Sequence, residues 1–347
     1  MARQRVWLLS AYRADSHAAW ADWLVHAFPE MDWTSLELPG RHFAWRIRGN
    51  PLSWLDTLPA ETPHRILATS MVDLATLRGL HPRLSHVPVD YYFHENQFAY
   101  PRSNAQMPSL EPQLVQLYGA LSADRLLFNS CFNRDSFLDG VADLLARMPD
   151  RAPSGVRDRL AARSRICPVP IRPLASAQRD TRLILWNHRW EYDKAPELFA
   201  EALCRLASAG LDFRVALLGR RHRQGAAALT RLRQTIPERI IADGRVPRAQ
   251  YQDLLGRAGL AVSTAMHEFQ GLAMLEAVSA GATPLVPDAL CYPEQYADAY
   301  RYPAGDVYAL TERLRHWLLD GPPQAPDVSR WCESRLRQDW ADILKKR

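Results

Sequence analysis

The sequence lacks a long hydrophobic run and contains few cysteines. No stretch of eighteen consecutive apolar residues occurs, so no membrane-spanning helix is predicted. The apolar residues 6–9 near the amino terminus are too few for the core of a signal peptide. The five cysteines are odd in number and widely scattered, so neither a disulfide framework nor a pair of metal ligands is predicted. We therefore expect a reducing compartment, the cytoplasm.

The composition is that of an ordinary globular protein. Its 347 residues, of which 47% are hydrophobic and 23% charged, predict about two domains of roughly 150–170 residues each. The formal net charge of +5 is compatible with an anionic partner such as a nucleotide or RNA. Many proteins with other partners are equally basic, so charge alone leaves the partner open.

Short apolar segments alternate with amphipathic ones along the whole chain. Such strand–helix alternation predicts parallel pairing and a doubly wound α/β sheet. The first half contains predicted strands at residues 6–9, 33–38, 65–69, 89–93 and 125–129. The second half contains predicted strands at residues 183–186, 213–219, 240–241, 260–264 and 283–286.

A proline-dense segment at residues 166–173 separates the two series. We predict a first domain at residues 1–172, a linker at 173–180 and a second domain at 181–326. Apolar residues at helical spacing in the tail predict a closing helix at 327–347 that packs back toward the first domain.

The most informative stretch is residues 267–277, which contain two acids, Glu268 and Glu276. A predicted strand precedes the stretch and a helix closed by a glycine follows it, so Glu268 is expected in the strand–helix loop and Glu276 within the helix. Gly271 is expected near the start of that helix, where backbone N–H groups and the helix dipole favour a phosphate. A solvated acid pair on an amphipathic helix is an equally valid interpretation of the spacing.

Basic residues form several further patterns. Arg189 and Lys194 fit either a phosphate site or a solvated charged loop. Residues 41–46 mix bases with aromatics, which fits base stacking with phosphate pairing as well as it fits a surface loop. Residues 220–223 and 345–347 are basic runs that fit either an RNA backbone or, more commonly, a solvated face.

Five segments carry a resemblance to a known family: residues 92–101, 128–133, 188–196, 267–277 and 291–294. Together they resemble glycosyltransferase family 4, whose members are retaining enzymes with two Rossmann-like domains. Within that family they are most similar to the glycosyltransferase-like domain-containing protein 1 group, which transfers mannose to queuosine in tRNA. The resemblance implies an α/β fold of the GT-B type, with two Rossmann-like doubly wound domains facing a central cleft.

The resemblance also implies roles for individual residues. Glu268 matches the acid that holds hydroxyls of the donor sugar, and Glu276 matches the acid that holds the ribose of the nucleotide. Arg189 and Lys194 match the pair that binds the diphosphate, and His94 matches a histidine near the donor sugar. Further donor-binding residues are implied to be Gly271, Leu272, His267 and Gly219. Acceptor-side candidates are Ser16, His17, Asn96, Gln97, Arg41 and Arg46.

Three of the histidines have alternative interpretations. His94 is equally interpretable as a hydrogen-bonded core histidine, and His17 as a residue that bonds the backbone. His267 fits a residue that only caps its loop. The sequence also departs from the wider family, which usually has glycine where His188 and Ala195 stand and glycine-phenylalanine in place of Phe269-Gln270.

The implied chemistry is transfer of a sugar from a nucleotide-sugar donor without a cofactor or metal. Arg189 and Lys194 would stabilise the charge that builds on the diphosphate, and no Asp-x-Asp metal motif stands at a strand end. The leading hypothesis is transfer of mannose from GDP-mannose to queuosine in tRNA, at the anticodon wobble position. A glycan, lipid or small-molecule acceptor and a non-catalytic binder of nucleotide sugar or tRNA are the alternatives. No stable membrane association and no obligate protein partner are predicted.

Overall fold

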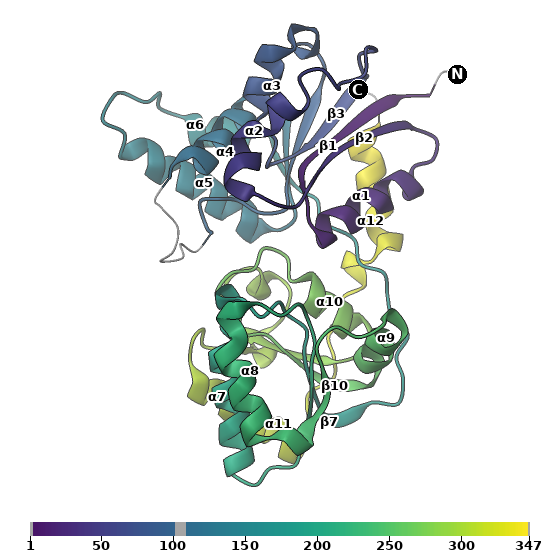
Figure 1. The fold of residues 1–347 in the computed structure, drawn as a ribbon, viewed down its shortest axis with the longest axis vertical. Helices are drawn as coiled ribbons and strands as arrows, with labels where there is room; N and C mark the ends of the chain where they lie inside the picture. The colour runs from purple at the N-terminus through teal and green to yellow at the C-terminus, as the bar shows by residue number, and fades with distance from the viewer. Residues whose placement is uncertain (1–2, 101–108, 346–347) are drawn as a thin grey trace. The chain divides into compact units, whose positions relative to one another are not determined.

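The computed structural model describes residues 3–100 and 109–345. The chain divides into two compact units, one of residues 3–169 with 337–345 and the other of residues 170–336 (Figure 1). Pro101, at the end of one predicted motif, and Lys346 and Arg347 of the basic tail lie outside the described residues.

The first unit is built on a six-stranded sheet in the order β2-β1-β3-β4-β5-β6, in which every neighbouring pair is parallel. Its strands are β1 (Arg5–Arg13), β2 (Asp32–Pro39), β3 (Arg65–Thr69), β4 (Val89–Phe93), β5 (Arg125–Phe128) and β6 (Ser164–Ile166). Its helices are α1 (Asp15–Ala27), α2 (Phe43–Ser53), α3 (Leu74–Leu80), α4 (Glu111–Ser122), α5 (Cys131–Ala146), α6 (Val156–Ala161) and α12 (Glu333–Leu344), whose first turn belongs to the second unit.

Both faces of this sheet are covered. Residues 6–11 of β1 are all buried, although successive side chains point to opposite faces. Trp7 and Leu9 pack in a core with residues of α2, α3 and α4. On the other face, Tyr92 of β4 stacks on Trp20 of α1 with ring centroids 4.6 Å apart. Trp340 of α12 packs beside both rings, so α1 and α12 cover that face.

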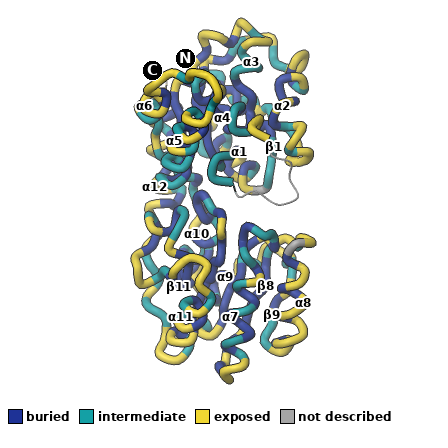
Figure 2. Tube along the Cα trace, turned by 90° about the vertical axis from the view of Figure 1, so that its left-hand side faces the viewer, coloured by how far each residue is buried: buried dark blue, intermediate teal, exposed yellow. Residues whose placement is uncertain are grey.

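The second unit repeats the plan with the sheet order β12-β11-β10-β7-β8-β9, again parallel throughout. Its strands are β7 (Asp180–Trp186), β8 (Arg214–Leu217), β9 (Ile240–Asp243), β10 (Ala258–Val262), β11 (Thr283–Pro287) and β12 (Arg301–Tyr302). Its helices are α7 (Pro196–Ser208), α8 (Ala226–Thr235), α9 (Arg248–Arg257), α10 (Leu272–Ser279) and α11 (Val307–Asp320). In Figure 2 buried stretches of the chain, such as β8 of the second unit, are dark blue, and many outer loops are yellow.

The closing helix begins at Glu333, later than the predicted start at residue 327. Cys332 is extended and forms a parallel bridge with Ile171. The Ile171 N–H donates to the Trp331 carbonyl at 2.9 Å and the Glu333 N–H donates to the Ile171 carbonyl at 3.0 Å. Strand-like pairing at this point therefore delays the helix and leaves Trp331 outside it.

An ion-pair cluster fixes the end of α12 to the first sheet. Asp90 of β4 is fully buried and accepts from Arg65 Nη1 at 2.6 Å and from Arg125 Nε at 2.5 Å. Arg125 also donates to the Ile343 carbonyl at 2.5 Å. One carboxylate thus holds two buried guanidinium groups, one of which reaches the last turn of α12.

We predict that Asp90→Asn lowers the free energy of unfolding of the first unit by about 3–5 kcal/mol, because two buried cations lose their partner. Urea unfolding followed by tryptophan fluorescence measures the change. Asp139→Asn, which removes an exposed partner of Arg157, is the matched control and should cost less than about 1 kcal/mol. Equal costs for the two variants would contradict the prediction.

Candidate active site

The two acids lie where the sequence pattern predicts them within the second unit. Strand β10 is buried along its whole length, and Glu268 lies in the loop between β10 and α10. Glu276 lies within α10. Gly271 caps that helix in the left-handed conformation, with φ of 65°, which glycine adopts at little cost. The first turn of α10 then closes on the Gly271 carbonyl, which accepts from the N–H groups of Met274 and Leu275.

A buried lysine joins this loop to the loop that follows β7. Lys194 Nζ lies 3.2 Å from Glu268 Oε2 and 3.3 Å from Asp193 Oδ2, and it donates to the His267 carbonyl at 2.5 Å. The Lys194 side chain is only 8% exposed and that of Asp193 only 1%. The two loops are also bonded through their backbones, since the Met266 N–H donates to the Asp193 carbonyl at 2.8 Å. Lys194 and Glu268, which are 74 positions apart in the chain, are thereby held next to each other.

The charges of this cluster stabilise one another. Burial alone would raise the pKa of Glu268, but the Lys194 ammonium and other neighbouring groups outweigh it and lower the pKa to about 2. Burial would lower the pKa of Lys194, but Glu268 and Asp193 outweigh it and raise the pKa. Glu268 is therefore ionised and Lys194 protonated at neutral pH.

The neighbouring histidines are neutral at the same pH. Burial, reinforced by the Lys194 charge, lowers the pKa of His188 to about 4 and that of His267 to about 4. His188 Nε2 is buried and has no hydrogen-bond partner among the described residues. The site therefore carries its positive charge on lysine and arginine rather than on imidazolium.

Arg189 extends the positive side of the site toward solvent. Its Nη1 lies 3.0 Å from Glu191 Oε2 and its Nη2 lies 3.7 Å from Asp193 Oδ2. Half of its side chain is exposed, whereas that of Lys194 is buried. Asp193 thus contacts both predicted phosphate-binding cations. It is a site residue that sequence reasoning missed, although it lies between them in the same motif.

Glu276 has its own hydrogen-bond chain. Tyr251 of α9 donates its hydroxyl to Glu276 Oε2 at 2.9 Å, and Asn187 Nδ2 donates to the Tyr251 hydroxyl at 2.7 Å. Burial raises the pKa of Glu276 and that of Tyr251. Asn187 directly follows β7, a signal that sequence reasoning did not use. Tyr251 lies inside a helix, and nothing in its sequence neighbourhood marks it.

Two backbone positions explain how the β7–α7 loop is shaped. Gly219 follows β8 with φ of 89°, and a Cβ there would lie 1.9 Å from the His188 carbonyl oxygen. Only glycine therefore lets this turn approach the loop that carries Arg189. Ala195, where the wider family has glycine, has φ of 43° and caps α7. An alanine thus occupies a left-handed position, which glycine would adopt at lower cost.

The first unit brings His94 and His17 together. His94 follows β4 and His17 lies in the first turn of α1, and their rings stack with centroids 4.1 Å apart. His17 Nδ1 lies 2.9 Å from the Tyr12 carbonyl oxygen. Burial lowers the pKa of His17 to about 4 and, together with His17, lowers the pKa of His94. His94 Nε2 is buried with no hydrogen-bond partner among the described residues.

The predicted acceptor-side residues differ in exposure. Asn96 is fully buried, donates to Asn133 and Ser136, and accepts from the N–H groups of Phe98 and Ala99. Both groups of its amide are thus used in folding the loop after β4. Gln97 is half-buried, and its backbone N–H donates to Gln116. Ser16 and Arg41 are exposed, and Arg46 is half-buried.

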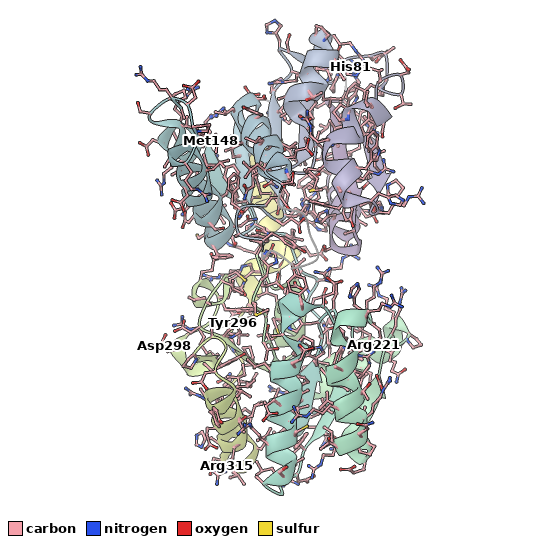
Figure 3. All side chains as sticks on the ribbon, turned by 60° about the vertical axis from the view of Figure 1, so that its left-hand side comes forward. His81, Met148, Arg221, Tyr296, Asp298 and Arg315 are labelled. Carbon is pink, nitrogen blue, oxygen red and sulfur yellow. The ribbon has the colours of Figure 1, made fainter. Side chains whose placement is uncertain are left out.

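The basic run at residues 220–223 is partly engaged in the fold. Arg221, labelled in Figure 3, lies over the Trp190 ring at 4.6 Å and pairs with Asp243. Its guanidinium also donates to the Leu217 carbonyl. In this run, which fits either an RNA backbone or a solvated face, Arg221 therefore contacts residues of the second unit itself.

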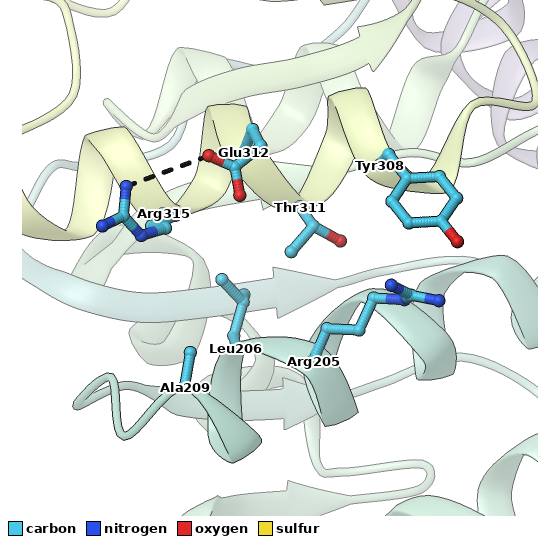
Figure 4. A pocket seen from close by; sticks show the side chains of 7 residues that line it. All are labelled: Arg205, Leu206, Ala209, Tyr308, Thr311, Glu312 and Arg315. Carbon is cyan, nitrogen blue, oxygen red and sulfur yellow. Dashed lines mark ion pairs between the residues drawn. The ribbon is translucent and has the colours of Figure 1, made fainter.

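Two surface hollows are lined by residues other than Arg189, Lys194 and Glu268. One lies between α7 and α11, where Arg205, Leu206 and Ala209 face Tyr308, Thr311 and Glu312 (Figure 4). The other lies beside residues 293–298 and Trp331. Across the described residues, no group of three or more His, Cys, Asp or Glu side chains is arranged to hold a metal ion. No helix among the residues that the structure describes is long and apolar enough to cross a membrane.

The fold and the comparison with known families define a class of protein. Residues 172–331 match the family described as "Glycosyl transferases group 1". Sucrose-phosphate synthase of Thermosynechococcus elongatus has a similar fold, with a TM-score of 0.75, 12% identity and 98% coverage of both chains. Anabaena HepE in complex with UDP gives a TM-score of 0.67, 12% identity and 99% coverage of both chains. The predicted α/β fold of the GT-B type is confirmed, and the chain is a glycosyltransferase.

The family can be stated more narrowly. Residues 5–171 match the description "tRNA-queuosine alpha-mannosyltransferase N-terminal". The tRNA-queuosine alpha-mannosyltransferase of Drosophila melanogaster is 30% identical over 328 residues, which cover 90% of this chain and 86% of the relative. The chain therefore belongs to the tRNA-queuosine alpha-mannosyltransferase family, and the predicted resemblance is confirmed.

The close approach at Gly219 leads to a test with a matched control. Gly219 and Gly210 both have positive φ, 89° and 73°, but a Cβ at Gly210 would meet no atom within 4 Å. We predict that Gly210→Ala lowers the free energy of unfolding by roughly 1–2 kcal/mol. Gly219→Ala should cost a further 1–3 kcal/mol or so because of the clash. Chemical unfolding of the second unit measures both, and similar costs would contradict the assigned role of Gly219.

Proposed function

We propose that this protein transfers mannose from GDP-mannose to queuosine in tRNA, with retention of the anomeric configuration. Family membership supports the acceptor and the sugar. The observation that carries the proposal is the buried Lys194, which holds Glu268 ionised and shares Asp193 with the half-exposed guanidinium of Arg189. A site of this kind offers cations for a diphosphate and a carboxylate for sugar hydroxyls within one loop cluster.

Arg189 and Lys194 are the proposed diphosphate ligands. Two negative charges build on the diphosphate as the bond to the sugar breaks, and fixed cations stabilise that charge without reorganisation. Arg189 supplies a forked set of donors and Lys194 a point charge. We propose that these two cations act without a metal ion and that the enzyme needs no cofactor.

Glu268 is the proposed ligand of the donor-sugar hydroxyls, and Glu276 that of the nucleotide ribose. Lys194 keeps Glu268 ionised, so its carboxylate accepts hydrogen bonds without titrating near neutral pH. Tyr251 binds one oxygen of Glu276, which leaves the other to accept from a ribose hydroxyl. Gly271 and Leu272 begin α10 and are the proposed backbone contacts of the sugar, with His267 and Gly219 as further donor-site residues.

Retention is proposed to follow front-face substitution. The acceptor hydroxyl oxygen bonds to the anomeric carbon as the bond to the diphosphate breaks, and the acceptor proton passes to a departing phosphate oxygen. Positioning then supplies most of the rate enhancement. His94 remains a predicted donor-sugar contact on the family resemblance alone. Because the proposed acceptor is a tRNA, we propose that the protein acts in the cytoplasm.

The acceptor is tested with labelled GDP-mannose and two tRNA samples, one with queuosine and one with guanosine at the wobble position. We expect label only in the queuosine-containing tRNA, because the proposed acceptor hydroxyl belongs to the queuosine ring. Mass spectrometry of digested tRNA identifies the labelled nucleoside. Equal labelling of both samples, or label only in a glycan or lipid acceptor, would overturn the proposed function.

The two acids should affect different kinetic constants. We predict that Glu268→Gln lowers kcat on the order of 100-fold, because its contacts strengthen as the sugar becomes cationic. Glu276→Ala should instead raise KM for GDP-mannose about 10-fold or more with little change in kcat, since ribose contacts are equal in ground and transition states. Steady-state kinetics with varied donor separates the two effects. A near-normal kcat for Glu268→Gln would remove this residue from the site.

A further inference from the structure

The loop that leads into α2 lies at the carboxyl edge of the first sheet. Residues 40–42 follow β2, and in a parallel sheet this end lies on the same edge as the end of β1. A Cβ at Gly40 would lie 2.6 Å from the Arg13 carbonyl oxygen, so the loop passes directly against the turn after β1. Phe43 packs edge-on against Tyr12, with ring centroids 6.2 Å apart. The start of α2 is thus tied to the end of β1, just before helix α1, which carries His17.

Trp45 lies flat on the surface of α2. A Cβ at Gly49, one turn further along, would lie 2.4 Å, 2.7 Å and 2.8 Å from three atoms of the indole. Similar distances to three atoms of one ring system mean that the indole places its face over Gly49. The residue is nevertheless 57% exposed. Gly49 therefore makes room for the ring, and the opposite face of the ring is open to solvent.

Uncompensated positive charge accompanies this ring. Within the described residues, no carboxylate forms an ion pair with Arg41 or Arg46, whereas Arg48 pairs with Asp73. Arg41 is exposed and Arg46 is half-buried. The Nε atom of Arg46 is buried and has no hydrogen-bond partner among the described residues. Arg46 Nη1 also donates to Ser53 Oγ at 3.4 Å. An open aromatic face together with guanidinium groups that form no ion pair within the described residues fits an unstacked base and its phosphates.

We propose that this surface of α2 binds the tRNA, with Trp45 stacking on an unpaired base and Arg41 and Arg46 contacting the phosphates beside it. This inference rests on the proposed function, because it takes tRNA as the acceptor. It assigns to Trp45 and Gly49 a role in RNA binding. Phosphate contacts give affinity that falls with salt, and stacking on Trp45 gives contact with any base, so binding here is not sequence-specific.

The test measures Kd for queuosine-containing tRNA with purified full-length protein. Trp45→Ala should raise Kd about 10-fold and Trp45→Phe less, because phenylalanine keeps a smaller stacking face. Gly49→Ala should also raise Kd, since the new methyl group displaces the indole while alanine favours the helix. The double variant Arg41→Glu, Arg46→Glu should raise Kd and reduce the slope of log Kd against log salt by about 1–2.

The matched control is Tyr308→Ala on α11 of the second unit, an aromatic residue that is 65% exposed beside Arg205. It should leave Kd for tRNA unchanged. GDP-mannose binding by calorimetry should be the same in every variant, which confirms that each variant is folded and keeps its donor site. Wild-type affinity for tRNA in Trp45→Ala and Gly49→Ala would overturn the inference, while mannosylation of tRNA by the same variants would leave the proposed function standing.

Leu52 separates an RNA surface from a protein or lipid surface. It lies seven residues after Trp45 on the same face of α2 and is 59% exposed. If the face binds RNA, Leu52→Ser should change Kd for tRNA less than twofold. Self-association is measured by sedimentation, and lipid binding is measured with anionic vesicles. The inference is wrong if Trp45→Ala and Leu52→Ser both abolish one of these two interactions and neither variant weakens tRNA binding. A wild-type protein that binds no tRNA would instead refute the proposed function.

Discussion

The second unit depends on one buried ammonium group. Lys194 forms ion pairs with Asp193 and Glu268 and donates to a backbone carbonyl of the β10–α10 loop. Without it two carboxylates would be buried together with no positive charge inside the cluster, which costs several kcal/mol. The same contacts that offset this cost also fix the side chains proposed to bind the donor. Stability and ligand recognition in this loop cluster therefore rest on the same interaction, and the half-exposed Arg189 adds to it from the solvent side.

Much of the architecture was predictable because parallel sheets have a strong local signature. A buried strand such as residues 183–186 is a continuous apolar run, and Glu268 and Glu276 follow β10 at the predicted places. The short strands β6 and β12 were missed, since Ser164–Ile166 and Arg301–Tyr302 are too short to show a period. The start of α12 was misplaced because the pairing of Cys332 with Ile171 joins residues far apart in sequence.

Residues of the candidate site could be predicted from the sequence only where they belong to a recognisable motif. The Arg189–Lys194 spacing marks a motif, whereas the contact of Asp193 with both cations appears only in three dimensions. Tyr251 reaches Glu276 from another helix, and a contact 25 residues away leaves no local trace. Asn96 shows the opposite case, since a polar residue in a family motif serves the fold of its own loop. Position after a strand thus predicts where a polar side chain lies, and the hydrogen bonds seen in the structure show whether that side chain also holds its own loop.

The chain path through the two units has a consequence for biosynthesis. The chain leaves the first unit after Val169 and returns to it only at Arg337, after it has formed the whole second unit. Trp340 covers the ring pair of Trp20 and Tyr92, and its indole N–H donates to the Pro168 carbonyl at 3.1 Å. During synthesis, the aromatic face of the first sheet therefore stays uncovered until residues 337–345 have left the ribosome. A fragment that ends near residue 170 would expose the same face and be prone to aggregation.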